Sequence, residues 1–102
     1  MKVKLNIPER YLLIQIIPQQ GNFETMSTIE ALTKVLYPSE VEVKKYGVKV
    51  EGERIVWNEE AADLIELEFT DKQKELIIKE LDNKSENEKL DFNQYLLYKK
   101  FK

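Results

Sequence analysis

The chain has 102 residues, of which 42% are hydrophobic and 34% charged, and its net charge is −3. It contains no histidine and no cysteine, which excludes a Cys/His zinc site, a Ser-His-Asp triad and a Cys-His dyad. This length and apolar content predict one α+β domain over 1–102, with a core of its own and no membrane span.

The predicted elements begin with a strand and two helices. Residues 1–7 alternate between polar and apolar types, which indicates a strand. Pro8 suits the first turn of a helix, and the apolar run 11–17 predicts a short, largely buried helix, with a strand as the alternative. Ser27 starts a Ser-x-x-Glu capping pattern ahead of an apolar helical period. We therefore expect a second helix over 27–37.

The middle of the chain predicts a short helix and then a hairpin. Ser39 starts another capping pattern, and Gly47 is suited to end the segment that follows. Two short β-prone runs within 48–57 flank Gly52, which can adopt the positive φ that a tight turn needs.

The last part of the chain predicts one more strand and two more helices. Residues 58–62 suit one helical turn, and 64–69 alternate as a strand does. Thr70 caps a further helix, 83–89 is the expected connector, and a final helix starts near 89–91. The predicted fold is therefore a set of helices packed on a three- to four-stranded antiparallel sheet.

The order of the first elements is that of a winged helix over 1–57, followed by a strand plus two helices over 58–102. The third helix would then read nucleic acid, with the hairpin as the wing. The candidate nucleic-acid-binding residues are Lys44, Lys45, Lys49 and Arg54. Four carboxylates on the same segments would repel phosphate, so we favour protein contacts or a scaffold role: Glu40, Glu42, Glu51 and Glu53.

Carboxylates are concentrated in the second half of the chain. Residues 59–91 hold twelve carboxylates and five lysines, a net charge of −7. Such a segment is either a set of solvated helix faces or an acidic surface for a basic partner. The candidate contact residues are Glu59, Glu60, Asp63, Glu66 and Glu68.

Paired acids can also hold Mg²⁺ or Ca²⁺, but the sequence has no EF-hand spacing and no glycine-rich phosphate loop. We expect no metal site, no cofactor and no enzyme activity.

Aromatic residues give a second set of candidates. Phe92, Tyr95, Tyr98 and Phe101 recur at helical spacing, which is typical of a core-facing stripe. An excess of aromatic surface on a terminal helix would instead suit a partner protein or a second copy. Trp57, at the end of the hairpin, is open to the same two interpretations.

Three segments resemble small phage or prophage proteins of similar length: Lys4 to Arg10, Gln20 to Phe23, and Glu51 to Trp57. The resemblance includes no catalytic motif and transfers no site residues. It implies an accessory protein, a group that includes inhibitors of host defence such as anti-CRISPR proteins. Those inhibitors occlude a nucleic-acid or regulatory surface of a larger complex.

The sequence therefore predicts a non-enzymatic interaction protein of the phage accessory or inhibitor type. It would lie in the cytoplasm and bind a host protein or ribonucleoprotein, such as a CRISPR effector, stoichiometrically. The acids of 59–68 would form the charged contact, and Trp57 or Tyr95 and Tyr98 would be the aromatic anchor. The sequence does not decide whether the chain forms a homodimer. The alternative function is a winged-helix nucleic-acid-binding regulator.

Overall fold

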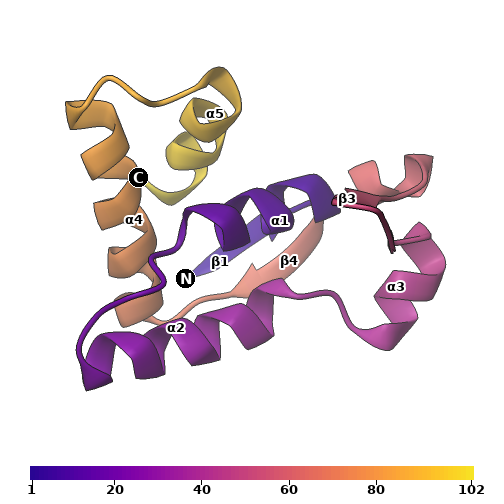
Figure 1. The fold of residues 1–102 in the computed structure, drawn as a ribbon, viewed down its shortest axis with the longest axis horizontal. Helices are drawn as coiled ribbons and strands as arrows, with labels where there is room; N and C mark the ends of the chain where they lie inside the picture. Colours follow the sequence, from indigo (N-terminus) through magenta and orange to yellow (C-terminus); the bar gives the residue numbers. More distant parts are fainter.

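The first strand and helix of the protein begin where the sequence predicts. The computed structural model describes residues 1–102 (Figure 1). β1 (Lys2–Leu5) alternates exposed and buried side chains. α1 (Ile7–Ile16) starts after Asn6, whose side chain accepts a hydrogen bond from the backbone N–H of Glu9 while the Glu9 carboxylate accepts from that of Asn6. This reciprocal capping satisfies two backbone donors that the first turn otherwise leaves unpaired.

The second helix starts one turn earlier than predicted. α2 (Phe23–Leu36) is capped by the side chain of Asn22, which accepts from the backbone N–H of Thr25 at 2.8 Å. Ser27 is therefore inside the helix, and its capping pattern is a chance match. Asparagine is as good a cap as serine, so the earlier start needs no glutamate three residues later.

The third helix agrees with the prediction. α3 (Glu40–Tyr46) has the reciprocal capping bonds between Ser39 and Glu42. It ends at Gly47, whose φ of +60° favours glycine.

The strands form two separate antiparallel pairs. β2 (Lys49–Glu51) and β3 (Arg54–Val56) make the predicted hairpin, with Gly52 at a φ of +64° in the turn. β4 (Ile65–Glu68) pairs instead with β1 at the other end of the sequence. The α+β class is confirmed, and the predicted three- to four-stranded sheet is replaced by two sheets of two strands each.

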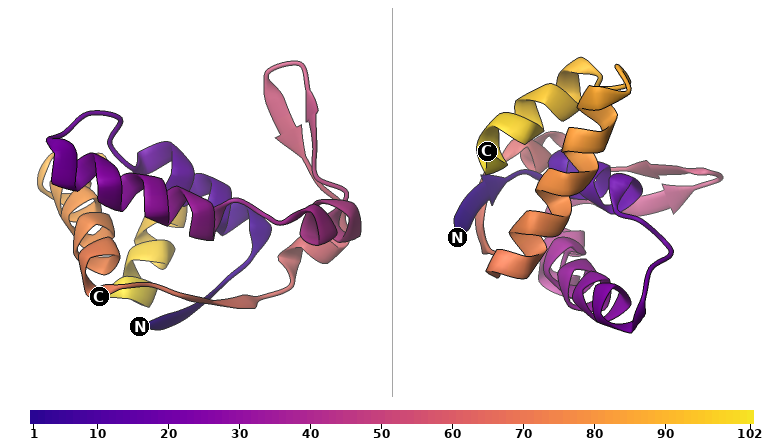
Figure 2. Two further views of the ribbon diagram at one scale, coloured as in Figure 1. Left: turned by 90° about the horizontal axis from the view of Figure 1, so that it is seen from below. Right: turned by 90° about the vertical axis from the view of Figure 1, so that its left-hand side faces the viewer.

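The chain between the two strand pairs keeps them apart, and the last helix packs beside β1. α5 (Phe92–Phe101) reaches β1, where Lys100 Nζ donates to the Lys4 carbonyl at 2.9 Å. The predicted helical turn is present as η1 (Glu59–Ala62), and it directs the chain away from the hairpin before β4 begins. The hairpin consequently projects from the body of the molecule (Figure 2).

The fourth helix is longer than the sequence predicts, which shortens the connector to the last helix. α4 (Asp71–Glu86) starts at the predicted Thr70 cap and continues through most of the expected connector 83–89. α5 is capped by Asp91, within the predicted range for its start. None of the helices is both long and apolar enough to cross a membrane.

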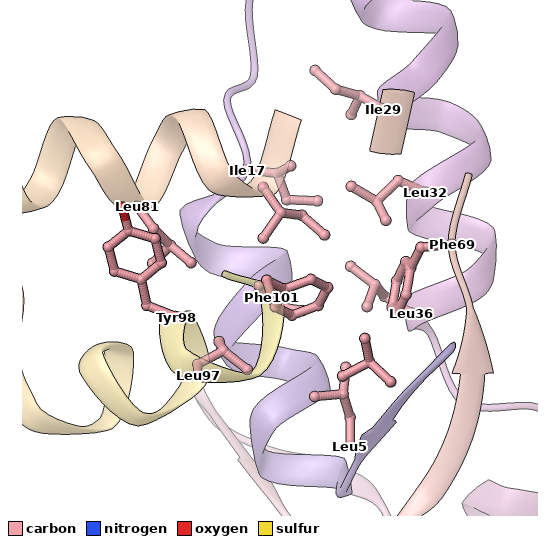
Figure 3. Packing of buried hydrophobic residues seen from close by; sticks show 13 residues of the cluster. Leu5, Ile17, Ile29, Leu32, Leu36, Phe69, Leu81, Leu97, Tyr98 and Phe101 are labelled. Atoms are coloured by element: carbon pink, nitrogen blue, oxygen red, sulfur yellow. The ribbon is translucent and has the colours of Figure 1, made fainter. Parts of the chain in front are cut away.

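One main core joins the two ends of the chain. Phe69 and Phe101 meet edge to face at its centre, with ring centroids 5.3 Å apart. Figure 3 shows buried side chains from α1, α2, α4, α5 and β1 packed around them, including Leu5, Ile17, Leu32, Leu81 and Leu97. A smaller cluster of Ile7, Tyr46 and Ala61 seats α3 and η1 against α1. The two clusters fix the base from which the hairpin projects.

Candidate functional site

Three of the five candidate acidic residues lie in or directly after η1, and the other two lie in β4, which pairs with β1. All five are exposed. Glu59 and Glu60 are in η1, and Asp63 follows it directly. None of these three carboxylates takes part in an ion pair.

The other two acids of the set have lysines opposite them. In the β1–β4 register Glu66 is opposite Lys4, and Glu68 is opposite Lys2. Directly opposed side chains of an antiparallel pair share one face of the sheet, with Cβ atoms about 5 Å apart. These lysines offset the charge of Glu66 and Glu68. Of the five candidate acids, only Glu59, Glu60 and Asp63 have neither an ion pair nor a lysine opposite them in a strand pair.

Trp57 belongs to an aromatic cluster that three separate segments build. Its indole stacks on Tyr11 of α1, with ring centroids 6.2 Å apart and an interplanar angle of 11°. Tyr11 also meets Tyr37, which follows α2, edge to face at 6.1 Å. Trp57 is 39% exposed and Tyr37 48% exposed. The cluster is therefore fixed by ring contacts and still open to solvent.

The hairpin extends this cluster with apolar side chains. Val50 and Ile55 are directly opposite each other, and strand alternation places Ile55 on the same face as Trp57. Val50 is 72% exposed and Ile55 37% exposed. We call Tyr11, Tyr37, Val50, Ile55 and Trp57 the hairpin surface.

Of these five residues, only Trp57 was singled out from the sequence. Tyr11 was included in a buried helix, and nothing in the sequence brings Tyr37 next to it. A signal for the hairpin residues was present, because a turn centred on Gly52 sets Val50 opposite Ile55 and leaves both on the face of Trp57.

Arg10 holds together the elements that carry the hairpin surface. Nothing in the sequence indicated this role. Its side chain is only 2% exposed. The guanidinium donates to the backbone carbonyls of Leu36 at 2.8 Å and Tyr37 at 3.1 Å, and pairs with the Glu42 carboxylate at 2.7 Å. Arg10 therefore ties α1 to the C-terminus of α2 and to the capping residues of α3. It fixes Tyr11, its neighbour in the chain, relative to Tyr37.

The electrostatics around Arg10 agree with this role. Burial raises the pKa of the Glu42 carboxyl, but hydrogen bonds from Arg10 and Ser39 and the charge of Arg10 outweigh it. The pKa of Glu42 is therefore lowered from its ordinary value of 4.5. Burial also raises the pKa of the Tyr11 hydroxyl, and nearby Tyr37 adds to that rise while Arg10 opposes it. Tyr11 is neutral at physiological pH and has its proton available for a hydrogen bond.

The candidate aromatic residues of α5 differ in exposure. Tyr98 is 8% exposed and belongs to the main core, whereas Tyr95 is 45% exposed. Both line a pocket of about 410 Å³ between the end of α4 and α5. We call it the α5 pocket, and its lining is Ser85, Leu90, Tyr95, Tyr98, Lys99 and Lys102.

The candidate nucleic-acid-binding residues lie on α3 and the hairpin and are all exposed. Lys44 and Lys45 occupy the last turn of α3. Lys49 pairs with Glu51 at 3.3 Å, and Arg54 is directly opposite Glu51 in the hairpin. One carboxylate thus offsets both cations of the hairpin, while Lys44 and Lys45 form no ion pair.

The acidic residues do not converge on a common point. No three carboxylates are close enough together to hold a metal ion. Comparison with known proteins finds no matching family model, no matching curated protein and no matching solved structure.

Proposed function

We propose that this chain is a non-enzymatic interaction protein that binds a protein partner stoichiometrically through its hairpin surface. The observation that carries the proposal is the open apolar face of the hairpin, on which Val50 is 72% exposed and Trp57 39% exposed. An isolated two-stranded hairpin is marginally stable in water, and contiguous apolar surface of this kind marks interaction sites.

The chemistry of the surface suits a protein partner. Tryptophan and tyrosine are the residue types that dominate binding energy at protein interfaces. Trp57 and Tyr11 are already stacked, so binding requires little further ordering of either ring. Glu59 and Glu60 follow Trp57 closely in the chain and place negative charge beside the surface, which selects for a basic partner.

The proposed partner is a host protein or ribonucleoprotein, and the proposed role is that of a cytoplasmic phage accessory or inhibitor protein. This part rests on the resemblance of three segments to phage proteins. One of those segments, Glu51 to Trp57, carries Ile55 and Trp57 of the hairpin surface.

The test is capture of partners from a nuclease-treated bacterial lysate by the tagged chain and by matched variants. Trp57→Ala and Ile55→Lys each change the hairpin surface. Phe23→Ser is the control, because Phe23 is 91% exposed on α2 and outside that surface. We expect one stoichiometric protein that the wild type and the Phe23 variant retain and the hairpin variants lose. Equal retention by all four would refute the proposal.

A second candidate function, nucleic-acid binding, is favoured by one observation, the exposed and unpaired Lys44 and Lys45 at the end of α3. It predicts duplex binding at low salt that falls steeply as salt rises and is lost in the double variant K44E/K45E. No binding of duplex DNA or RNA at low salt would eliminate it.

A further inference from the structure

The α5 pocket has the opposite charge to the chain as a whole. Residues 92–102 contain three lysines and no acidic side chain, whereas the whole chain has a net charge of −3. Lys100 is occupied by an ion pair with Glu9 at 2.8 Å, while Lys99 and Lys102 form none. Two cations without an ion-pair partner therefore line this pocket.

The positions of these two lysines and the apolar lining determine which ligand the α5 pocket can bind. Lys99 Nζ lies 5.6 Å from the ring centroid of Tyr95, and Lys102 Nζ donates a hydrogen bond to the Tyr98 hydroxyl at 3.2 Å. These contacts keep the ammonium groups beside the two rings. Leu90 and the two tyrosine rings supply the apolar part of the pocket lining. The matching ligand is a segment that combines an apolar side chain with neighbouring carboxylates.

The chain itself displays such a segment. Leu64 is 56% exposed, and Asp63 precedes it directly. Glu59 and Glu60 lie just before them in η1, and none of the three carboxylates is ion-paired. We call Glu59, Glu60, Asp63 and Leu64 the acidic loop.

The pocket and the acidic loop are in different parts of the molecule. α5 lies beside α4, whereas η1 lies with α3 at the hairpin end (Figure 1). They do not meet within one molecule, so a contact between them requires two copies. Each copy then has one free pocket and one free loop, which gives head-to-tail association.

We propose that the α5 pocket of one copy binds the acidic loop of a second copy. Leu64 enters the pocket between Leu90 and Tyr98, and the loop carboxylates face Lys99 and Lys102. Because the charged groups lie at an exposed rim, the association is weak and sensitive to salt. It uses none of the five residues of the hairpin surface, and it shares with the proposed function only Glu59 and Glu60, whose charge lies beside that surface.

Sedimentation velocity from micromolar to millimolar concentration at low salt tests this directly. We expect the wild type to associate beyond its monomer mass of 12.1 kDa. Raising the salt should weaken that association by at least about tenfold. Leu64→Ser and the double variant K99E/K102E should each stay monomeric, while the control Phe23→Ser associates as the wild type does. Circular dichroism checks that the variants fold.

A mixture of the two monomeric variants gives the sharpest result. The Leu64 variant keeps an intact pocket, and the lysine variant keeps an intact acidic loop. An equimolar mixture should therefore form a one-to-one dimer and nothing larger. A mixture that stays monomeric would overturn the proposal. A wild type that stays monomeric at millimolar concentration and low salt, or association of K99E/K102E equal to that of the wild type, would also overturn it.

Discussion

Replacing Arg10 with methionine tests whether the buried guanidinium holds α1, α2 and α3 together. The side chain is 2% exposed and donates to the carbonyls of Leu36 and Tyr37 as well as to the Glu42 carboxylate. Methionine preserves much of the apolar contact but supplies no donor. The two carbonyls at the end of α2 then lose their side-chain partner inside the protein.

The expected cost follows from those contacts. An acceptor left buried without a partner costs about 1–3 kcal/mol, and Arg10→Met removes the donor from the buried carbonyl of Leu36 and the partly buried carbonyl of Tyr37. Glu42 loses its partner as well, but it lies nearer the solvent, with 23% of its side chain exposed, and water can hydrate it. We therefore expect the free energy of unfolding to fall by about 3 kcal/mol, a large part of the roughly 5–15 kcal/mol typical of a domain.

Urea unfolding followed by circular dichroism measures this loss. At a typical slope of about 1–3 kcal/mol per molar urea, the midpoint should fall by about 1–3 M. Glu30→Gln is the matched control, because the Glu30–Lys34 pair is 3.8 Å long and both side chains are 77% exposed. That variant should change stability by less than about 1 kcal/mol. An Arg10 variant as stable as the control would refute the structural role of Arg10.

Three further predictions concern pH, the core and the end of α3. Since the folded pKa of Glu42 is lowered, its contribution to stability is complete above the ordinary carboxyl value of 4.5. That contribution is lost as pH falls through the lower folded value. The free energy of unfolding, measured at decreasing pH, should therefore fall less in Glu42→Gln than in the wild type. Phe69→Ala should cost about 3–5 kcal/mol in thermal unfolding because the ring is 1% exposed, whereas Phe23→Ala should cost little. Gly47→Ala should cost about 1 kcal/mol in urea unfolding, since Gly47 has a φ of +60° and a Cβ there would lie 3.3 Å from Asn58 Nδ2; an unchanged midpoint would contradict this.

Local signals in the sequence predicted the helices well. The capping bonds of Ser39 and Thr70 join residues three apart, so the sequence alone contains both partners. The hairpin around Gly52 is equally local. Asn22 was missed as a cap because its pattern lacks the glutamate or glutamine that marks the others.

Contacts between distant residues could not be predicted in this way. β1 pairs with β4, which lies more than fifty residues away in the chain. Neither strand contains a sequence signal that identifies the other as its pairing partner. The same holds for the candidate site. Arg10 reads as an ordinary charged residue until α2 brings its last carbonyls to it, and Tyr37 meets Tyr11 only after that packing. The lysines opposite Glu66 and Glu68 likewise emerge only from the pairing of the two strands.

Hydrogen–deuterium exchange of the chain, alone and with its captured partner, tests the central claim most directly. If the hairpin surface is the binding site, backbone amides of residues 48–57 should exchange more slowly in the complex. Those of the exposed first turn of α2, which carries Phe23, should be unchanged. Protection confined to α5, with none in the hairpin, would contradict the account.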